Sequence, residues 1–134
     1  MEDKTQIKNA MTEKEIFIEG FKKRTRKFGA DVILFCNSLI KSQASSVVIY
    51  QLVKAATSTG ANYRAACRGR SKAEFYSKIC IVVEEADESE FWLELILEAK
   101  LSNNLVELTR LTKEANEITK VVTKAKHSSY GNSR

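Results

Sequence analysis

The sequence predicts an all-α protein, an antiparallel up-down-up-down four-helix bundle, on three observations. Proline is absent from the 134 residues and only five glycines occur, so the chain lacks the breakers that turn-rich β folds need. Four segments carry apolar residues at alternating spacings of three and four, the period of one helix face. The connections between them are short, which favours antiparallel neighbours. We expect one bundle domain at 13–126, between a mobile segment at 1–12 and a disordered tail at 127–134.

The first two helices follow from their apolar faces and from polar residues that can cap them. We expect the first helix at about 14–41, and the second from a cap at Ser45 or Ser46 to near Gly69. The face of the first consists of Phe21, Thr25, Phe28, Val32, Phe35 and Leu39. The face of the second consists of Ile49, Val53, Ala56, Gly60, Tyr63 and Cys67.

The third and fourth helices show the same pattern. Ser71 is followed three residues later by Glu74, a capping-box spacing, so we expect the third helix to begin there and to run to about Lys100. Its face consists of Phe75, Ile79, Val82, Ala86, Leu93 and Ile96. The fourth helix follows the SNN sequence at 102–104, and its face consists of Leu105, Leu108, Ala115, Ile118 and Val122.

Gly60 and the bulky residues of the third helix suggest where helices or subunits meet. A glycine inside a helix costs about 1 kcal/mol, so something is expected to approach Gly60 closely. Either a bulky pair such as Phe91 and Trp92 packs there, or a ligand-binding groove opens. The segment from Phe91 to Leu97 is apolar on more than one face, which predicts a homo-oligomer interface at Phe91, Trp92 and Leu95. The alternative is that Trp92 is covered within its own subunit.

Charge is divided unevenly along the chain, although the net charge is only +5. Residues 20–78 contain twelve Lys or Arg and two carboxylates, whereas 79–107 contain eight carboxylates and one Lys. The cations most relevant to binding are Lys22, Lys23, Arg24, Arg26, Lys27, Arg64, Arg68, Arg70 and Lys72. If they merge at one end of the bundle, they form a patch for the phosphate backbone of RNA or DNA. Alternatively, they pair with the carboxylates of the third helix, within or between subunits.

A structural polar cluster is also expected between the second and third helices. Asn62 lies next to the apolar face of the second helix, and Glu85 and Glu88 lie one turn apart on the third. These positions predict a buried hydrogen-bond cluster with Arg24 as counter-ion. Simple exposure to solvent is the alternative.

The residue inventory argues against an enzyme, a cofactor and a metal site. The only histidine, His127, lies in the expected tail, so no core Ser or Cys has a histidine base. The carboxylates between Glu84 and Glu90 are more typical of a solvated helix face than of a cation site. Three cysteines without a CxxC pair suit reduced thiols in a cytoplasmic protein. No apolar run approaches the roughly 20 residues of a membrane span, and no signal peptide is expected.

Four motifs resemble a known family: RTRKF from Arg24, QLVKAATSTGAN from Gln51, YRAACRGRSKAEF from Tyr63 and EEADESEFWLELI from Glu84. Over about residues 20–125 the chain resembles the bacterial 23S rRNA intervening-sequence proteins, also called S23 ribosomal proteins. More distantly, it is similar to the accessory proteins of diversity-generating retroelements. The resemblance implies a four-helix bundle assembled into a ring, a pentamer, with a basic surface that contacts nucleic acid. Many relatives carry a glutamate where this chain has Ala65, so a role of that glutamate is not expected here.

The leading functional hypothesis is a non-enzymatic oligomeric protein that binds nucleic acid through its basic patch. The alternative is a protein-interaction or scaffolding bundle without a nucleic-acid role. An enzyme is third, because it would need a metal at the carboxylates of the third helix.

Overall fold

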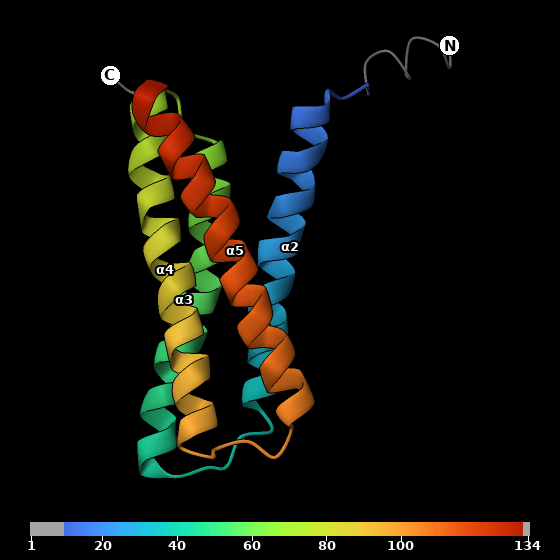
Figure 1. Cartoon of the computed structure of the whole chain (residues 1–134), viewed down its shortest axis with the longest axis vertical. Coiled ribbons are helices and arrows are strands. Elements are labelled where there is room, and N and C mark those ends of the chain that lie inside the picture. Colours follow the sequence, from blue (N-terminus) through green and yellow to red (C-terminus); the bar gives the residue numbers. More distant parts are fainter. Residues whose placement is uncertain (1–9, 133–134) are drawn as a thin grey trace.

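The computed structural model describes residues 10–132, except for the side chains of the last two of these residues. It contains α2 (Glu13–Cys36), α3 (Gln43–Cys67), α4 (Lys72–Glu98) and α5 (Leu105–Asn132), and no strand within residues 10–132. The predicted all-α four-helix bundle is therefore confirmed (Figure 1). The first nine residues of the predicted mobile segment lie outside the described residues. None of the described helices combines the length and hydrophobicity needed to cross a bilayer.

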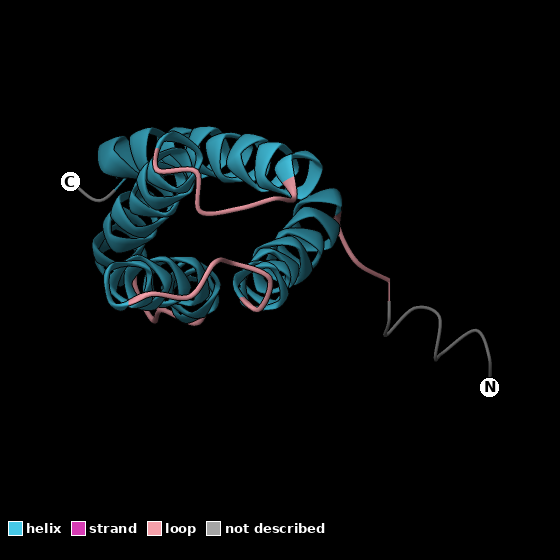
Figure 2. Cartoon of the chain, turned by 90° about the horizontal axis from the view of Figure 1, so that it is seen from below, coloured by secondary structure: helices cyan, strands magenta, loops and turns pink. Residues whose placement is uncertain are grey.

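The helices alternate in direction, and each packs against the next along the chain (Figure 1). The contact between α2 and α5 closes the bundle over a shorter length, because these two helices cross and then diverge toward the start of α2 (Figure 1). At the opposite end, the α2–α3 and α4–α5 connections run near each other (Figure 2). The amide of Ile40 donates to the carbonyl of Leu101 at 3.0 Å and ties the two connections together.

All four helices begin at side-chain caps, and at the start of α5 the Oδ1 of Asn104 accepts from the amide of Glu107 at 3.2 Å. Thr12 and Glu15 form a capping box at the start of α2. Ser71 accepts from the amide of Glu74 at 3.1 Å, which confirms the predicted start of α4. The predicted start of α3 is wrong, because Ser42 caps this helix and its hydroxyl accepts from the amide of Ser45 at 3.0 Å.

Two helix ends also differ from the prediction. Helix α2 ends at Cys36 rather than near residue 41, since the Ser38 hydroxyl donates to the carbonyl of Phe35 and the chain turns toward α3. Helix α5 continues to Asn132, so the predicted disordered tail is wrong for residues 127–132. The rings of Tyr130 and Tyr76 lie 5.6 Å apart, a contact with α4 that supports this last turn.

The predicted apolar face of the first helix is confirmed, because all six of its residues are buried, although Leu39 lies beyond the end of α2. On α4, five of the six predicted residues are buried, and Ser89 completes the stripe. On α5, the prediction that Leu105 is buried is wrong: it is 55% exposed, because this first residue of the helix lies beyond the core. Leu111 is fully buried, although it was not predicted to be.

Helix α3 is rotated relative to its predicted face. It packs against both α2 and α4 and turns small residues toward them, so its buried stripe is centred about one residue earlier in the sequence. The residues buried on α3 are Ser45, Leu52, Ala55, Ala56, Thr59, Tyr63 and Ala66. Of the predicted face, only Ala56 and Tyr63 are buried.

Candidate functional site

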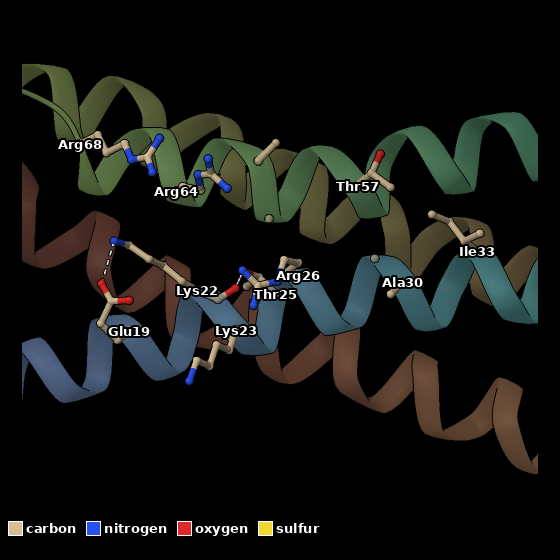
Figure 3. Close-up of a pocket in the computed structure, with 13 residues that line it drawn as sticks. Glu19, Lys22, Lys23, Thr25, Arg26, Ala30, Ile33, Thr57, Arg64 and Arg68 are labelled. Atoms are coloured by element: carbon tan, nitrogen blue, oxygen red, sulfur yellow. Dashed lines mark hydrogen bonds and ion pairs between the residues drawn. The ribbon is translucent and has the colours of Figure 1, made fainter.

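A groove of about 670 Å³ lies between α2 and α3 (Figure 3). Both of its walls carry cations, and its floor is made of small residues. We define the basic groove by its cations, which are Lys22, Lys23, Arg26, Arg64 and Arg68. The other lining residues are Glu19, Thr25, Gly29, Ala30, Ile33, Thr57, Gly60 and Ala61.

Two glycines set the close approach of the helices at this floor. A Cβ on Gly60 would lie 3.2 Å from the carbonyl carbon and oxygen of Thr25. A Cβ on Gly29 would lie 3.5 Å from the carbonyl oxygen of Ala56. The backbones of α2 and α3 therefore nearly touch at both points, as small residues on facing helices allow.

The approach to Gly60 corrects one expectation. The neighbour is the backbone of α2, not the pair Phe91 and Trp92. Helix α4 passes Ser58 at Glu85, so the aromatic pair lies nearly two turns farther along α4. Of the two alternatives predicted for Gly60, a bulky neighbouring side chain or a groove, the structure shows a groove.

The antiparallel register places the cations in order along the groove. Gly60 lies beside Thr25, and the rings of Phe21 and Tyr63 meet edge to face with centroids 4.8 Å apart. This register sets Arg64 at the level of Lys22, with Arg68 one turn to one side and Arg26 one turn to the other. Figure 3 shows Arg64 and Arg68 on one wall and Lys22 and Arg26 on the other, while Lys23 is directed away from α3.

Most of these cations have no carboxylate partner. Lys22 forms an ion pair with Glu19, Nζ to Oε1 3.0 Å, whereas the other four groove cations form none within the described residues. No lysine or arginine of residues 10–132 forms an ion pair with the carboxylates of α4. The alternative prediction, in which these cations pair with the carboxylates of the third helix within one subunit, is therefore wrong for the described residues. The groove carries concentrated positive charge.

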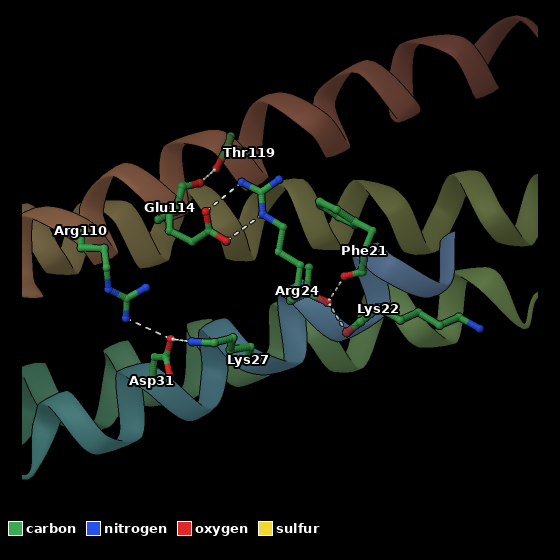
Figure 4. A network of polar contacts seen from close by, with 10 residues as sticks. Phe21, Lys22, Arg24, Lys27, Asp31, Arg110, Glu114 and Thr119 are labelled. Atoms are coloured by element: carbon green, nitrogen blue, oxygen red, sulfur yellow. Dashed lines mark hydrogen bonds and ion pairs between the residues drawn. The ribbon is translucent and has the colours of Figure 1, made fainter. Parts of the chain in front are cut away.

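The other predicted cations lie elsewhere. Arg24 points to α5, where its Nε and Nη2 donate to the two carboxylate oxygens of Glu114, each at 2.8 Å (Figure 4). These hydrogen bonds raise the pKa of Arg24 above its already high value. Lys27 forms an ion pair with Asp31 at 2.7 Å, and Arg70 and Lys72 are exposed at the α3–α4 turn.

Asp31 belongs to a second link between α2 and α5 (Figure 4). Its Oδ2 accepts from Arg110 Nη2 at 3.0 Å, and Arg110 also binds Glu107 at 2.7 Å. Burial raises the pKa of Asp31, but the hydrogen bonds from Lys27 and Arg110 lower it by more, so the net shift is downward. We call Arg24, Glu114, Asp31 and Arg110 the α2–α5 clamp.

The predicted polar cluster is wrong as a shared network. Asn62 donates to the carbonyl of Ser58 in its own helix at 2.9 Å, and Glu88 accepts from Trp92 Nε1 at 3.3 Å. Glu85 faces α3 one turn away from Asn62, so the three side chains do not converge. Burial, followed by the charge of Glu88, raises the pKa of Glu85.

The outer face of α4 carries the predicted interface residues. Phe91 is 51% exposed and meets Trp92 edge to face with ring centroids 5.1 Å apart. Trp92 and Leu95 are half-buried, and Trp92 packs against the core of its own subunit. The same face exposes Leu97 and carboxylates without an ion-pair partner among the described residues, namely Glu84, Asp87, Glu94 and Glu98.

Metal-ligating side chains do not gather in the part of the chain that the structure describes. Within residues 10–132, no three His, Cys, Asp or Glu side chains are placed to hold a metal ion. His127 is exposed on α5. Burial raises the pKa of the Cys36 thiol to about 11 and also raises that of Cys67, so both thiols stay protonated at neutral pH.

The sequence reasoning missed the floor of the groove and the clamp. A Gly-Ala pair at 29–30 and another at 60–61 form much of the floor, and this repeat in two neighbouring helices is a signal of close approach. Glu114 and Arg110 had no comparable signal, because their partners are 90 and 79 residues away in the chain.

Comparisons with known proteins agree with this architecture. Residues 20–124 match the family model described as 23S rRNA-intervening sequence protein. A solved structure from Bacteroides thetaiotaomicron, described as a protein of unknown function from the S23 ribosomal protein family, is 27% identical with a TM-score of 0.69. The alignment covers 78% of this chain and 96% of that one. No curated protein matches significantly.

Proposed function

The chain belongs to the family of 23S rRNA-intervening sequence proteins, and we propose that it is a non-enzymatic, oligomeric protein whose basic groove binds the phosphate backbone of a nucleic acid. One observation carries this proposal: five cations gather in one groove, and only Lys22 has a carboxylate partner among the described residues. Unneutralised cations in a concave site attract polyanions and release their counterions on binding.

The proposal includes a homo-oligomer in a cytoplasmic location. The exposed Phe91 and Leu97 support a subunit contact on α4, and the family resemblance makes a pentameric ring the expected form. Three free cysteines support a reducing compartment. Light scattering on the purified protein measures the subunit number, and a monomer at micromolar concentration would contradict this part of the proposal.

A second candidate function is a protein-interaction bundle. The observation that favours it is the outer face of α4, where exposed apolar side chains stand among unpaired carboxylates. Such a face suits a basic protein surface better than a nucleic acid. A specific protein partner retained after nuclease treatment, together with no binding of RNA or DNA, would put this function first.

The test of nucleic-acid binding is fluorescence anisotropy with labelled structured RNA, single-stranded RNA and duplex DNA at several salt concentrations. The test variant is Arg26→Gln with Arg64→Gln, and the control is Lys113→Gln with Lys120→Gln, which changes net charge equally on exposed positions of α5. We expect affinity to fall as salt rises and the groove variant to bind far more weakly than the control. Equal affinity of the two variants would remove the groove from the proposed function.

A further inference from the structure

The cations of the basic groove recur at the repeat of a helix. Along the groove the three arginines, which have no ion-pair partner among the described residues, occupy three levels: Arg68, then Arg64, then Arg26. The ammonium of Lys22 extends instead to Glu19 (Figure 3). Neighbouring levels are one turn apart, about 6 Å at the α-helical rise. This step is close to the separation of successive phosphates along one nucleic-acid strand.

The width of the groove favours one strand over two. Packed helices have axes about 8–10 Å apart, depending on the side chains at the contact. Because the backbones of α2 and α3 nearly touch at Gly29 and Gly60, we expect this pair at the short end of that range. A single backbone between the walls contacts the cations of both helices. A duplex is much wider than this gap, so it would rest on the rim and contact fewer of them.

The floor offers no means of reading bases. Among the described residues that line the groove, none has an aromatic side chain on which a base could stack. The hydroxyl of Thr57 donates to the carbonyl of Val53, and that of Thr25 donates to the carbonyl of Phe21, so neither hydroxyl proton is free for a base edge. Bases of a bound strand would therefore face solvent.

From the spacing, the width and the floor we infer that the basic groove takes the sugar–phosphate backbone of a single strand, independent of its sequence, with three successive phosphates at the three cation levels. This inference rests on the proposed function and narrows it to single-stranded RNA or DNA. Binding of three phosphates to single strands gives a slope of about −2 for log affinity against log salt. Affinity then falls about 20-fold between about 50 and 200 mM salt.

The experiment measures anisotropy of labelled oligothymidylate, oligouridylate and a short DNA duplex over this salt range. We expect both single strands to bind with the slope of about −2 and the duplex to bind more weakly. Single variants Arg26→Gln, Arg64→Gln and Arg68→Gln should each reduce the slope by about 0.7, whereas Lys113→Gln leaves it unchanged.

A second pair of variants tests the floor by adding charge instead of removing it. Ala61→Glu places a carboxylate in the groove at an exposed position, and Ala44→Glu places one elsewhere on α3, also exposed. We expect only Ala61→Glu to abolish single-strand binding.

The possible outcomes distinguish a failure of the single-strand inference from a failure of the proposed nucleic-acid binding. Duplex binding as tight as single-strand binding, and equally sensitive to the groove variants, overturns the inference and leaves the proposed function standing. No binding of any probe at about 50 mM salt overturns both. Groove variants that alter subunit number while every probe binds as before would show that the groove serves the assembly and not a nucleic acid, which also overturns both.

Discussion

Replacing Gly60 with alanine tests how closely α2 and α3 must approach. The added Cβ would lie 3.2 Å from the carbonyl carbon and oxygen of Thr25 and 3.3 Å from the amide nitrogen of Arg26. These are helix backbone atoms, which cannot rotate away as a side chain can, so α2 itself must shift. Such overpacking costs about 1–3 kcal/mol, whereas removing a helical glycine gains about 0.5–1 kcal/mol. We expect Gly60→Ala to lower the free energy of unfolding by about 1 kcal/mol.

Two other glycines provide matched controls within the same pair of helices. Within residues 10–132, a Cβ on Gly20 would meet nothing within 4 Å, and a Cβ on Gly29 would make only ordinary contacts at 3.5 Å. Both alanine variants should keep the gain in helix propensity, about 1 kcal/mol. The three variants should therefore span about 2 kcal/mol, with Gly60→Ala alone less stable than the natural chain.

The assay is urea unfolding followed by circular dichroism at one fixed protein concentration, because self-association adds to apparent stability. A Gly60→Ala variant as stable as Gly20→Ala would refute the reasoning. It would mean that α2 moves away without cost and that the close approach at the groove floor is not needed by the fold.

Three further predictions concern a cap, the clamp and a carboxyl group. Ser42→Ala should cost about 1 kcal/mol in urea unfolding because Ser42 caps α3, whereas Ser46→Ala should be nearly neutral; equal effects would contradict the observed cap. A double-mutant cycle of Arg24→Gln and Glu114→Gln should give a coupling of about 0.5–1 kcal/mol that weakens with salt, since the side chains are 39% and 24% exposed, and zero coupling would show that the pair does not stabilise the fold. The raised pKa of Glu85 means that its charge opposes folding at neutral pH and that this penalty disappears as pH falls toward the unfolded value of 4.5. Glu85→Gln should therefore raise stability at pH 7 and lose that advantage near pH 4, and an equal gain at both pH values would rule out ionisation as the cause.

The cations on the two sides of α2 have different surroundings. Its face toward α3 carries Lys22 and Arg26 into the groove, while its face toward α5 carries Arg24 into the clamp. The Arg24–Glu114 ion pair joins α2 to α5 at 2.8 Å, and beyond it the two helices diverge toward the start of α2 (Figure 4).

The sequence alone determined the elements of the fold. The buried face of α2 and the start of α4 at Ser71 were predicted correctly, because helical periodicity and N-capping are local properties of a few neighbouring residues. The sequence signals for where a helix ends were weaker. The last turn of α5 was missed because Tyr130 finds its partner, Tyr76, on another helix.

Only the tertiary structure decided which cations share a site. Arg24 and Arg26 are two residues apart in the same basic run, yet one binds Glu114 and the other lines the groove. The two side chains leave the helix about 200° apart, so their surroundings depend on how α3 and α5 are rotated around α2. That rotation follows from packing at Gly29 and Gly60 against residues distant in sequence, and the spacing of charges along one helix does not contain it.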